Sequence, residues 1–328
     1  MRQEVTGVTK RTLRRIALVV LGFTSVVPLL AWVYDLGTFK GWFWGVSVPG
    51  GVALLIVALV SAHSSGPASS LHQSLSSAAV AGVIGTLMYD IFRVPFMVLG
   101  GYRLLSPIDS YGVLLLGAES SSGLTSLAGW TYHFSNGIGF AVAYSALALR
   151  RHWLWGVAFA MLLECGTLVT PFAQDYNLSG NWPVIAIAFA AHVPYGLVLG
   201  FMLRDPSITH REMSRIYRHP GRAALGMTLA ALATWLSPWS VHTPNGLMPS
   251  DNAAVQSGSM RPEFVRVNEG ECFSLRNLDD VPHQVSQGLG MPVIPPGEAA
   301  EICIEGSGVI RLRITDGPYD GGFVIVED

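Results

Sequence analysis

The sequence is poor in charged residues and in cysteine. Only 13% of its 328 residues are Asp, Glu, Lys or Arg, whereas 50% are hydrophobic. A soluble globular chain carries about 25% charged residues, so a chain that is soluble along its whole length is excluded. The net charge of −2 says nothing about nucleic acid, but the sequence has no dense basic stripe, so no nucleic-acid partner is expected. Three cysteines are too few for a disulfide scaffold or a zinc cluster. The lipid bilayer is therefore the expected partner.

Long apolar runs are abundant, and they predict an all-α membrane domain with seven transmembrane helices. A helix needs about 20 apolar residues to cross the hydrocarbon core of a bilayer. The second run contains Ser47, Pro49, Gly50 and Gly51, which predict a kink or a break. The predicted spans are Ile16–Tyr34, Trp42–Ala62, Ser77–Gly100, Ala128–Leu149, Trp153–Phe172, Pro183–Leu203 and Ala223–Val241.

The positions of lysine and arginine predict the orientation of these spans. Cytoplasmic loops carry an excess of Lys and Arg. With the N-terminus inside, the outer loops between the spans hold only Lys40 and Arg103. The inner segments hold Arg2, Lys10, Arg11, Arg14, Arg15, Arg150, Arg151, Arg204, Arg211, Arg215, Arg218 and Arg222. We therefore expect a plasma-membrane protein with a cytoplasmic N-terminus and an extracytoplasmic C-terminal part.

A change in composition after the seventh span divides the chain into three parts. Residues 1–241 form the predicted membrane domain, and residues 242–259 have the Pro, Gly, Ser and Asn content of a linker. Residues 260–328 alternate apolar and polar residues with a period of two, which predicts a small all-β sandwich. Its predicted strands are Phe264–Val267, Cys272–Asn277, Ala300–Ile304, Val309–Ile314 and Gly322–Val326.

The order of motifs in this last part resembles the cupredoxin family. Asn277–Val285 follows the family's N-x-D-x-x-x-H-x-V pattern, which would place the first copper histidine at His283. Ile294–Glu298 comes next, and Gly321–Val326 is similar to the final strand of the family. The resemblance implies a cupredoxin-like sandwich with a residual ligand position at His283.

The copper-binding loop of the family is not matched. A type 1 copper site needs a cysteine thiolate together with histidine and a weak axial methionine. The corresponding positions here are Ile314, Gly317 and Asp320, and residues 308–328 contain no Cys, His or Met. We therefore expect no type 1 copper.

Two further expectations follow from the resemblance. His283 is either a strand-end histidine kept by ancestry of the fold or part of a weak Cu(I) site with Met291 or Met260. Cys272 and Cys303 fall on strands that are neighbours in the family's sheet, outside the membrane, where a disulfide is expected. Closing a loop of about 30 residues would stabilise the fold by roughly 3–4 kcal/mol.

Ionisable residues inside the predicted spans form a candidate site. A charge in the hydrocarbon core costs several kcal/mol unless it is paired or hydrated. Asp90 and Arg93 are three residues apart, so they lie on one helical face. The candidates would meet in a polar pocket if the third to sixth spans surround it. They are Asp90, Arg93, His133, Glu164 and His192, with Tyr89, Asn136 and Tyr195 in support.

Three functions remain open at this point, and the sequence does not decide whether the protein is an enzyme. The first is a multi-pass membrane protein whose extracytoplasmic module binds or senses a protein or small molecule. The second is an intramembrane metal-dependent hydrolase, in which two histidines and two carboxylates hold zinc or iron. The third is a copper-handling or electron-transfer accessory protein. Alternatively, Asp90–Arg93 and Glu164–His192 pairs only hold the helices together.

Overall fold

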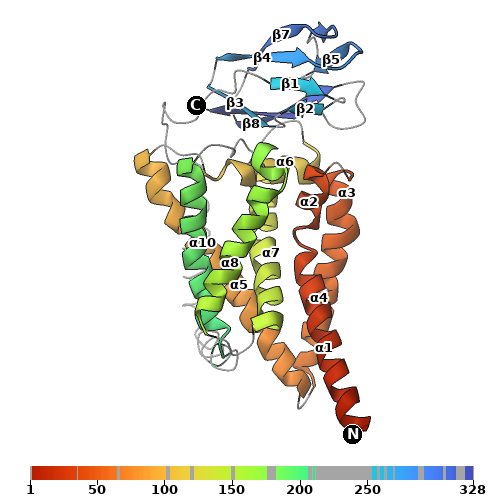
Figure 1. Cartoon of the computed structure of the whole chain (residues 1–328), viewed down its shortest axis with the longest axis vertical. Coiled ribbons are helices and arrows are strands. Elements are labelled where there is room, and N and C mark those ends of the chain that lie inside the picture. Colours follow the sequence, from red (N-terminus) through yellow and green to blue (C-terminus); the bar gives the residue numbers. More distant parts are fainter. Residues whose placement is uncertain are drawn as a thin grey trace.

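A computed structural model shows a bundle of helices with a β-sandwich at one end (Figure 1). The structure describes residues 2–34, 36–64, 67–100, 104–118, 122–148, 152–175, 182–205, 209, 211, 253–256, 259–261, 264–268, 270–286, 292–305, 308–314 and 322–327. The predicted seventh span, Ala223–Val241, lies outside the described residues.

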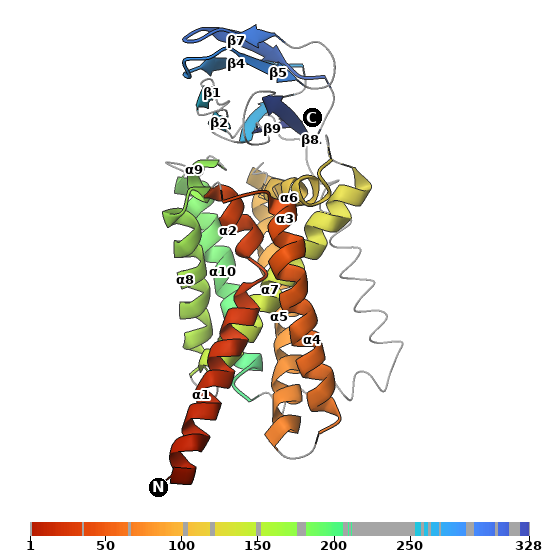
Figure 2. The same cartoon turned by 90° about the vertical axis from the view of Figure 1, so that its right-hand side faces the viewer.

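The helical part follows the apolar runs of the sequence. The longer helices are α1 (Arg2–Phe23), α4 (Val48–Ala62), α5 (Pro67–Gly100), α7 (Gly123–Ala148), α8 (Leu154–Val169) and α10 (Trp182–Met202). The shorter ones are α2 (Val27–Val33), α3 (Phe39–Trp42), α6 (Ser106–Leu116) and α9 (Phe172–Asp175). Helix α10 packs against α8 and α5, and α7 packs against α5 and α1. The short helices gather at the end of the bundle that faces the sandwich (Figure 2).

Two of the predicted spans are interrupted. Within the first, Thr12–Phe23 and Val27–Val33 meet at an angle of 59°. Pro28 lies in the first turn of α2, where its missing N–H is not needed. Within the second, a π-helical turn at Phe43–Ser47 separates α3 from α4. This turn lies just before Pro49 and agrees with the kink expected there.

Fewer helices than predicted meet the requirements for crossing a membrane. Among the described residues, Phe39–Ala62, Ser70–Gly100 and Trp182–Met202 are long and apolar enough, and the bent α1–α2 pair would make four. Seven spans are therefore not supported. Helix α8 has only 16 residues, fewer than the roughly 20 that span the hydrocarbon core. Helix α7 is long enough, but polar residues interrupt its apolar character between Thr125 and Asn136.

The C-terminal part is a sandwich of two sheets. One sheet has the order β2-β1-β4-β7 and the other β3-β9-β8-β5-β6, and apolar side chains fill the space between them. The predicted strands correspond to β3 (Phe264–Asn268), β4 (Cys272–Asn277), β7 (Ala299–Cys303), β8 (Gly308–Ile314) and β9 (Gly322–Glu327). The sequence analysis missed β1 (Ala253–Gln256), β2 (Ser259–Arg261), β5 (His283–Ser286) and β6 (Val293–Ile294).

The position of β1 changes the boundary of the module. Ala253–Gln256 lies within residues 242–259, which were predicted to be a linker. The strand pairs in parallel with β4, and Ala253 and Val255 are buried in the sandwich core. A four-residue strand is too short to show a period in the sequence, which explains why it was missed. The β module therefore begins no later than Ala253.

The β module packs directly on the end of the bundle that α2, α3 and α6 form (Figures 1 and 2). Val309 of β8 and Phe323 of β9 belong to one hydrophobic cluster with Leu29 and Tyr111. The rings of Trp32 and Phe323 meet edge to face, with their centres 6.3 Å apart. The module is therefore docked through a shared apolar core.

Truncation of Trp32 tests this docking. The Trp32→Ala variant is expected to expose β8 and β9 more often, because the ring contributes a large apolar area to the contact with Phe323. Hydrogen–deuterium exchange of the detergent-solubilised chain should then be faster in these two strands. Trp44→Ala is the matched control, since Trp44 is 61% exposed on the side of the bundle. Unchanged exchange in Trp32→Ala would contradict the docking.

Candidate functional site

Asp90, Arg93 and His133 form one buried group between α5 and α7. The carboxylate of Asp90 accepts a hydrogen bond from Nη2 of Arg93, one turn later on the same helix. His133 Nε2 lies 3.1 Å from Oδ2 and 3.2 Å from Oδ1 of Asp90. Because an ionised carboxylate only accepts hydrogen bonds, Nε2 is the protonated nitrogen of His133. Asp90 is thus shared by a guanidinium and an imidazole.

The guanidinium of Arg93 has two further contacts. Nη1 donates to the carbonyl oxygen of Leu104 at 2.7 Å. Cζ lies 4.2 Å from the centre of the Tyr89 ring, a cation–π contact. Since the charges of Asp90 and Arg93 cancel, the group is electrically neutral when His133 is neutral. This arrangement avoids an unbalanced charge inside the bundle.

Glu164 and His192 form a second pair, between α8 and α10. His192 Nδ1 donates to the carbonyl oxygen of Ala188 at 2.8 Å and lies 3.4 Å from Oε2 of Glu164. Glu164 is buried, and no Lys or Arg in the described part of the chain forms a salt bridge with it. A lone carboxylate is costly at such a position. The pair is therefore neutral overall only when it holds a proton.

Tyr89 lies between the two pairs and connects them. The centre of its ring is 4.8 Å from that of His192, edge to face, and 6.2 Å from that of His133. Side chains from α5, α7, α8 and α10 thereby meet around one phenol. We call this set the bundle cluster; its members are Tyr89, Asp90, Arg93, His133, Glu164 and His192.

The imidazoles of the bundle cluster are more accessible than its charged groups. The side chains of His133 and His192 are 17% and 14% exposed, whereas those of Asp90 and Glu164 are 8% and 5% exposed. The carboxylates therefore lie behind the imidazoles. The other ring nitrogens, Nδ1 of His133 and Nε2 of His192, form no hydrogen bond with any described residue.

The two remaining predicted residues do not join the cluster. The hydroxyl of Tyr195 donates to the carbonyl oxygen of Gly137 at 2.9 Å and so connects α10 to α7. Asn136 is buried on α7, one turn from His133, and makes no described contact with Asp90 or Glu164. We interpret both as supports for helix packing, close to Gly137, where a Cβ would collide with Thr86.

The structure also shows polar partners that the sequence analysis missed. The carbonyl groups of Leu104 and Ala188 orient Arg93 and His192, and no side-chain pattern signals a backbone acceptor. Outside the cluster, Ser126 Oγ donates to Asp109 at 2.7 Å and links α7 to α6. Burial raises the pKa of the Asp109 carboxyl, an effect that the Ser126 hydrogen bond partly offsets.

The predicted zinc or iron centre is not supported. Among the described residues, no three His, Cys, Asp or Glu side chains come together as metal ligands. The physical reason is the pairing within the cluster. Asp90 is already taken up by Arg93 and the protonated nitrogen of His133, and the His192 nitrogen that faces Glu164 donates to a carbonyl group. The residues do not fit a metal here, so no reaction step is assigned to one.

In the β module, His283 is buried and held by its own loop. Nε2 of His283 lies 2.8 Å from Oδ2 of Asp279. Asn277 holds the loop by donating from Nδ2 to the carbonyl oxygens of Val281 at 2.7 Å and Ile294 at 2.9 Å. His283 Nδ1 has no hydrogen-bond partner among the described residues. The N-x-D-x-x-x-H stretch thus forms a closed turn around the histidine.

The other predicted copper positions contribute little that a metal could use. Ile314 is an apolar residue buried in β8, where it pairs with Val285. Gly317, Asp320 and Met291 lie outside the described residues. Met260 is buried in the sandwich core. A Cu(I) site at His283 stays a prediction.

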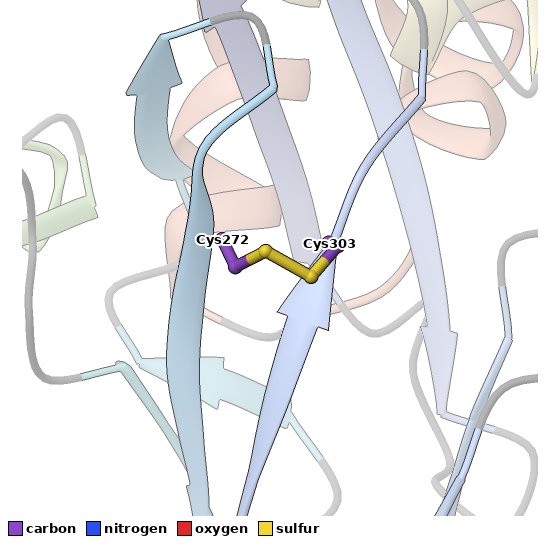
Figure 3. Close-up of a disulfide and its surroundings, with 2 residues drawn as sticks. All are labelled: Cys272 and Cys303. Carbon is purple, nitrogen blue, oxygen red and sulfur yellow. A yellow bond between two sulfur atoms is a disulfide. The ribbon is translucent and has the colours of Figure 1, made fainter.

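The expected disulfide is confirmed. Cys272 of β4 and Cys303 of β7 are directly opposite each other in the antiparallel pair, and their sulfur atoms are bonded (Figure 3). Among the described strands, β7 pairs only with β4, so the bond fixes an edge strand of the first sheet. Cys165, on α8, is an exposed free thiol.

Comparison with known proteins separates the two parts of the chain. A family model described as "Family of unknown function (DUF6789)" matches residues 72–211, which include every member of the bundle cluster. A search of curated protein sequences finds no match.

The small C-terminal β region gives the matches to solved structures, which are cupredoxins. A mutant of amicyanin in its reduced state is 19% identical, with 23% of this chain and 79% of that chain covered and a TM-score of 0.22. A purple cupredoxin from Nitrosopumilus maritimus is 21% identical, with 23% and 97% covered and a TM-score of 0.21. A copper-containing nitrite reductase from Thermus scotoductus SA-01 is 18% identical, with 27% and 25% covered and a TM-score of 0.21.

Proposed function

We propose that this chain is a multi-pass membrane protein whose bundle cluster binds and releases protons. The β module would act on the extracytoplasmic side as a binding or sensing module for a protein or a small molecule. The module is docked above the cluster through Phe323, Trp32 and Tyr111, and Tyr132 belongs to the same apolar cluster. Tyr132 directly precedes His133 in the sequence, so the apolar cluster on which the module is docked shares helix α7 with the proposed proton site.

The observation that carries this proposal is the double carboxylate–imidazole arrangement around Tyr89. Asp90 pairs with His133, and Glu164 lies beside His192, so two carboxyl groups and two imidazoles, all able to take up and release protons, are held side by side. Ionisable chains of this kind within membrane helices mark proton pathways. Asp90 has a fixed cation in Arg93, whereas Glu164 has none among the described residues, so we assign the exchangeable proton to the Glu164–His192 pair.

The same proposal includes a membrane topology. Helices α7 and α8 supply His133 and Glu164 and pack within the same bundle as α5 and α10, and we propose that they also cross the plasma membrane. The α7 helix, with 26 residues, is about 39 Å long, which is sufficient for a crossing. The excess of Lys and Arg on one side supports a cytoplasmic N-terminus and an extracytoplasmic module.

Infrared difference spectroscopy tests the proton site. The chain would be reconstituted in lipid nanodiscs, and spectra would be compared between mildly acidic and mildly alkaline buffer. We expect a carbonyl band of a protonated carboxylic acid that changes with pH and disappears in Glu164→Gln. Glu271→Gln is the matched control, because Glu271 lies at the surface of the β module. A spectrum without a pH-dependent carboxylic acid band, or one that Glu164→Gln leaves intact, would contradict the proposal.

A further inference from the structure

The bundle cluster contains two hydrogen-bond acceptors, one on each of the two imidazoles that lie near the Tyr89 ring. His133 uses Nε2–H to donate to Asp90, and His192 uses Nδ1–H to donate to the Ala188 carbonyl group. In a neutral imidazole the other nitrogen carries a lone pair. Nδ1 of His133 and Nε2 of His192 are therefore acceptors, and no described residue donates to either of them.

The groups behind the imidazoles strengthen these acceptors. An oxygen acceptor that takes the N–H of an imidazole fixes its tautomer and makes the opposite nitrogen a better base. The Asp90 carboxylate acts in this way on His133, with 3.1 Å between Oδ2 and Nε2, and the Ala188 carbonyl group acts in this way on His192. Both imidazoles are partly exposed while both carboxylates are buried. The accessible side of the cluster is thus built to receive hydrogen bonds.

The surroundings of these acceptors are aromatic and apolar. The ring of Trp130 meets His133 edge to face at 5.7 Å between centres, and Phe134 lies 5.9 Å from the same imidazole. Tyr89 separates the two imidazoles and presents a flat ring with one hydroxyl group. His192 lies near the middle of α10, one of the helices that are long and apolar enough to cross a bilayer. A ligand would therefore reach the cluster through lipid more readily than through water.

We propose that the bundle cluster binds a lipophilic aromatic diol, a molecule of the quinol class, through its two hydroxyl groups. One hydroxyl donates to Nδ1 of His133 and the other to Nε2 of His192, while the ring packs beside Tyr89. This inference rests on the proposed function, because the same two imidazoles belong to the proton-binding pairs.

Calorimetry with a simple quinol tests this inference. Tetramethylhydroquinone would be titrated under anaerobic conditions into the full chain in lipid nanodiscs, with empty nanodiscs as the blank. Its dimethyl ether, which has the same ring and no hydroxyl hydrogen, is the matched ligand control. We expect the ether to bind at least about tenfold more weakly, since two hydrogen bonds are lost. Equal binding of the two compounds, or no binding of the quinol, would overturn the inference.

Variants then assign the contacts to individual residues. His133→Phe and His192→Phe are each expected to weaken quinol binding about tenfold while leaving binding of the ether unchanged. His63→Phe is the control, because His63 is exposed at the end of α4. If these variants fail to fold, ¹⁵N-histidine NMR of the unaltered chain replaces them. There, the unprotonated ring nitrogens of two histidines should shift with the quinol and stay unchanged with the ether.

The two proposals fail separately. A pH-dependent carboxylic acid band without quinol binding would overturn the ligand assignment and leave the proton site intact. Quinol binding without that band would overturn the proton site and retain the hydroxyl-binding face. Equal affinity for the ether and the quinol would show that the ring binds to an apolar surface and that the hydroxyl groups form no hydrogen bonds with the protein.

Discussion

Replacement of Asp90 by asparagine is expected to destabilise the helical bundle by about 3–5 kcal/mol, because Arg93 would stay buried without its counterion. Asp90 accepts from both Arg93 and His133, and both Asp90 and Arg93 are less than a tenth exposed. Thermal unfolding of the detergent-solubilised chain, followed by intrinsic fluorescence, should show a clearly lower midpoint than that of the unaltered protein.

A second substitution distinguishes two causes of the lower stability: the loss of the counterion of Arg93 and the loss of the Asp90 carboxylate itself. Arg93→Met in the Asp90→Asn background is expected to recover most of the lost stability, since the buried cation is then removed as well. Asp109→Asn is the matched control outside the cluster. Burial raises the pKa of the Asp109 carboxyl, so its ionised form lowers the stability as the pH rises above the unfolded-state pKa. At neutral pH, Asp109→Asn should therefore leave the stability unchanged or raise it slightly. An Asp90→Asn variant as stable as the unaltered protein would contradict the buried pair.

Removal of the disulfide by Cys272→Ala with Cys303→Ala is expected to destabilise the β module by roughly 3–4 kcal/mol. The bond joins residues 31 positions apart and holds β7, which pairs only with β4 among the described strands. The unfolded module would gain the freedom of that loop. Proteolysis of the full chain at increasing urea concentrations should cleave the module at a lower concentration in the variant.

Cys165→Ala is the control for this experiment, because Cys165 is a free thiol on α8, in the helical part of the chain. It should leave the urea dependence of proteolysis unchanged. Mass spectrometry after alkylation, with and without reduction, should show two additional labelled cysteines in the reduced chain. A double variant whose module resists proteolysis like the unaltered chain would show that the sandwich core alone determines the stability of the module.

The sequence predicted those parts of the fold that depend on long periodic segments. The five longer strands were found because alternation is visible over five to seven residues. The strand Ala253–Gln256 and the two-residue strand Val293–Ile294 were missed because each is too short to show alternation and is defined by its pairing with β4 or β5. The π-helical turn was foreseen as a kink from Pro49 and the adjacent glycines, whereas the 59° bend before Pro28 was not.

The number of spans shows the limit of counting apolar residues. Helix α8 was predicted as a 20-residue span from Trp153 to Phe172, yet the helix ends at Val169 and Thr170 has an extended backbone. Hydrophobicity marks the segment that prefers lipid, but Pro171 disfavours a helical backbone at the preceding Thr170 and so ends the helix. The seventh predicted span lies in the part of the chain that the structure does not describe.

The candidate site was predictable in its membership more than in its chemistry. Because an ionisable side chain in the hydrocarbon core is costly, the sequence pointed to Asp90, Arg93, His133, Glu164 and His192. In the structure these five residues lie together with Tyr89 in the bundle cluster. The pairing of Asp90 with Arg93 follows from a spacing of three residues. The metal interpretation is not supported by the geometry of the described residues, because no three candidate ligands come together and the Asp90 carboxylate is already bound by Arg93 and His133. Only the folded structure reveals these partners.

The contact between Trp32 and Phe323 joins the first part of the chain to the last. Trp32 leaves the ribosome early, whereas Phe323 belongs to β9, which follows every other described element in sequence. Strand β9 also pairs with both β3 and β8, so its arrival completes the second sheet. During synthesis, the part of the apolar end of α2 and α6 that Phe323 covers therefore stays uncovered until β9 has been made. A chain that stops before β9 would expose this apolar surface, which favours association with other exposed apolar surfaces.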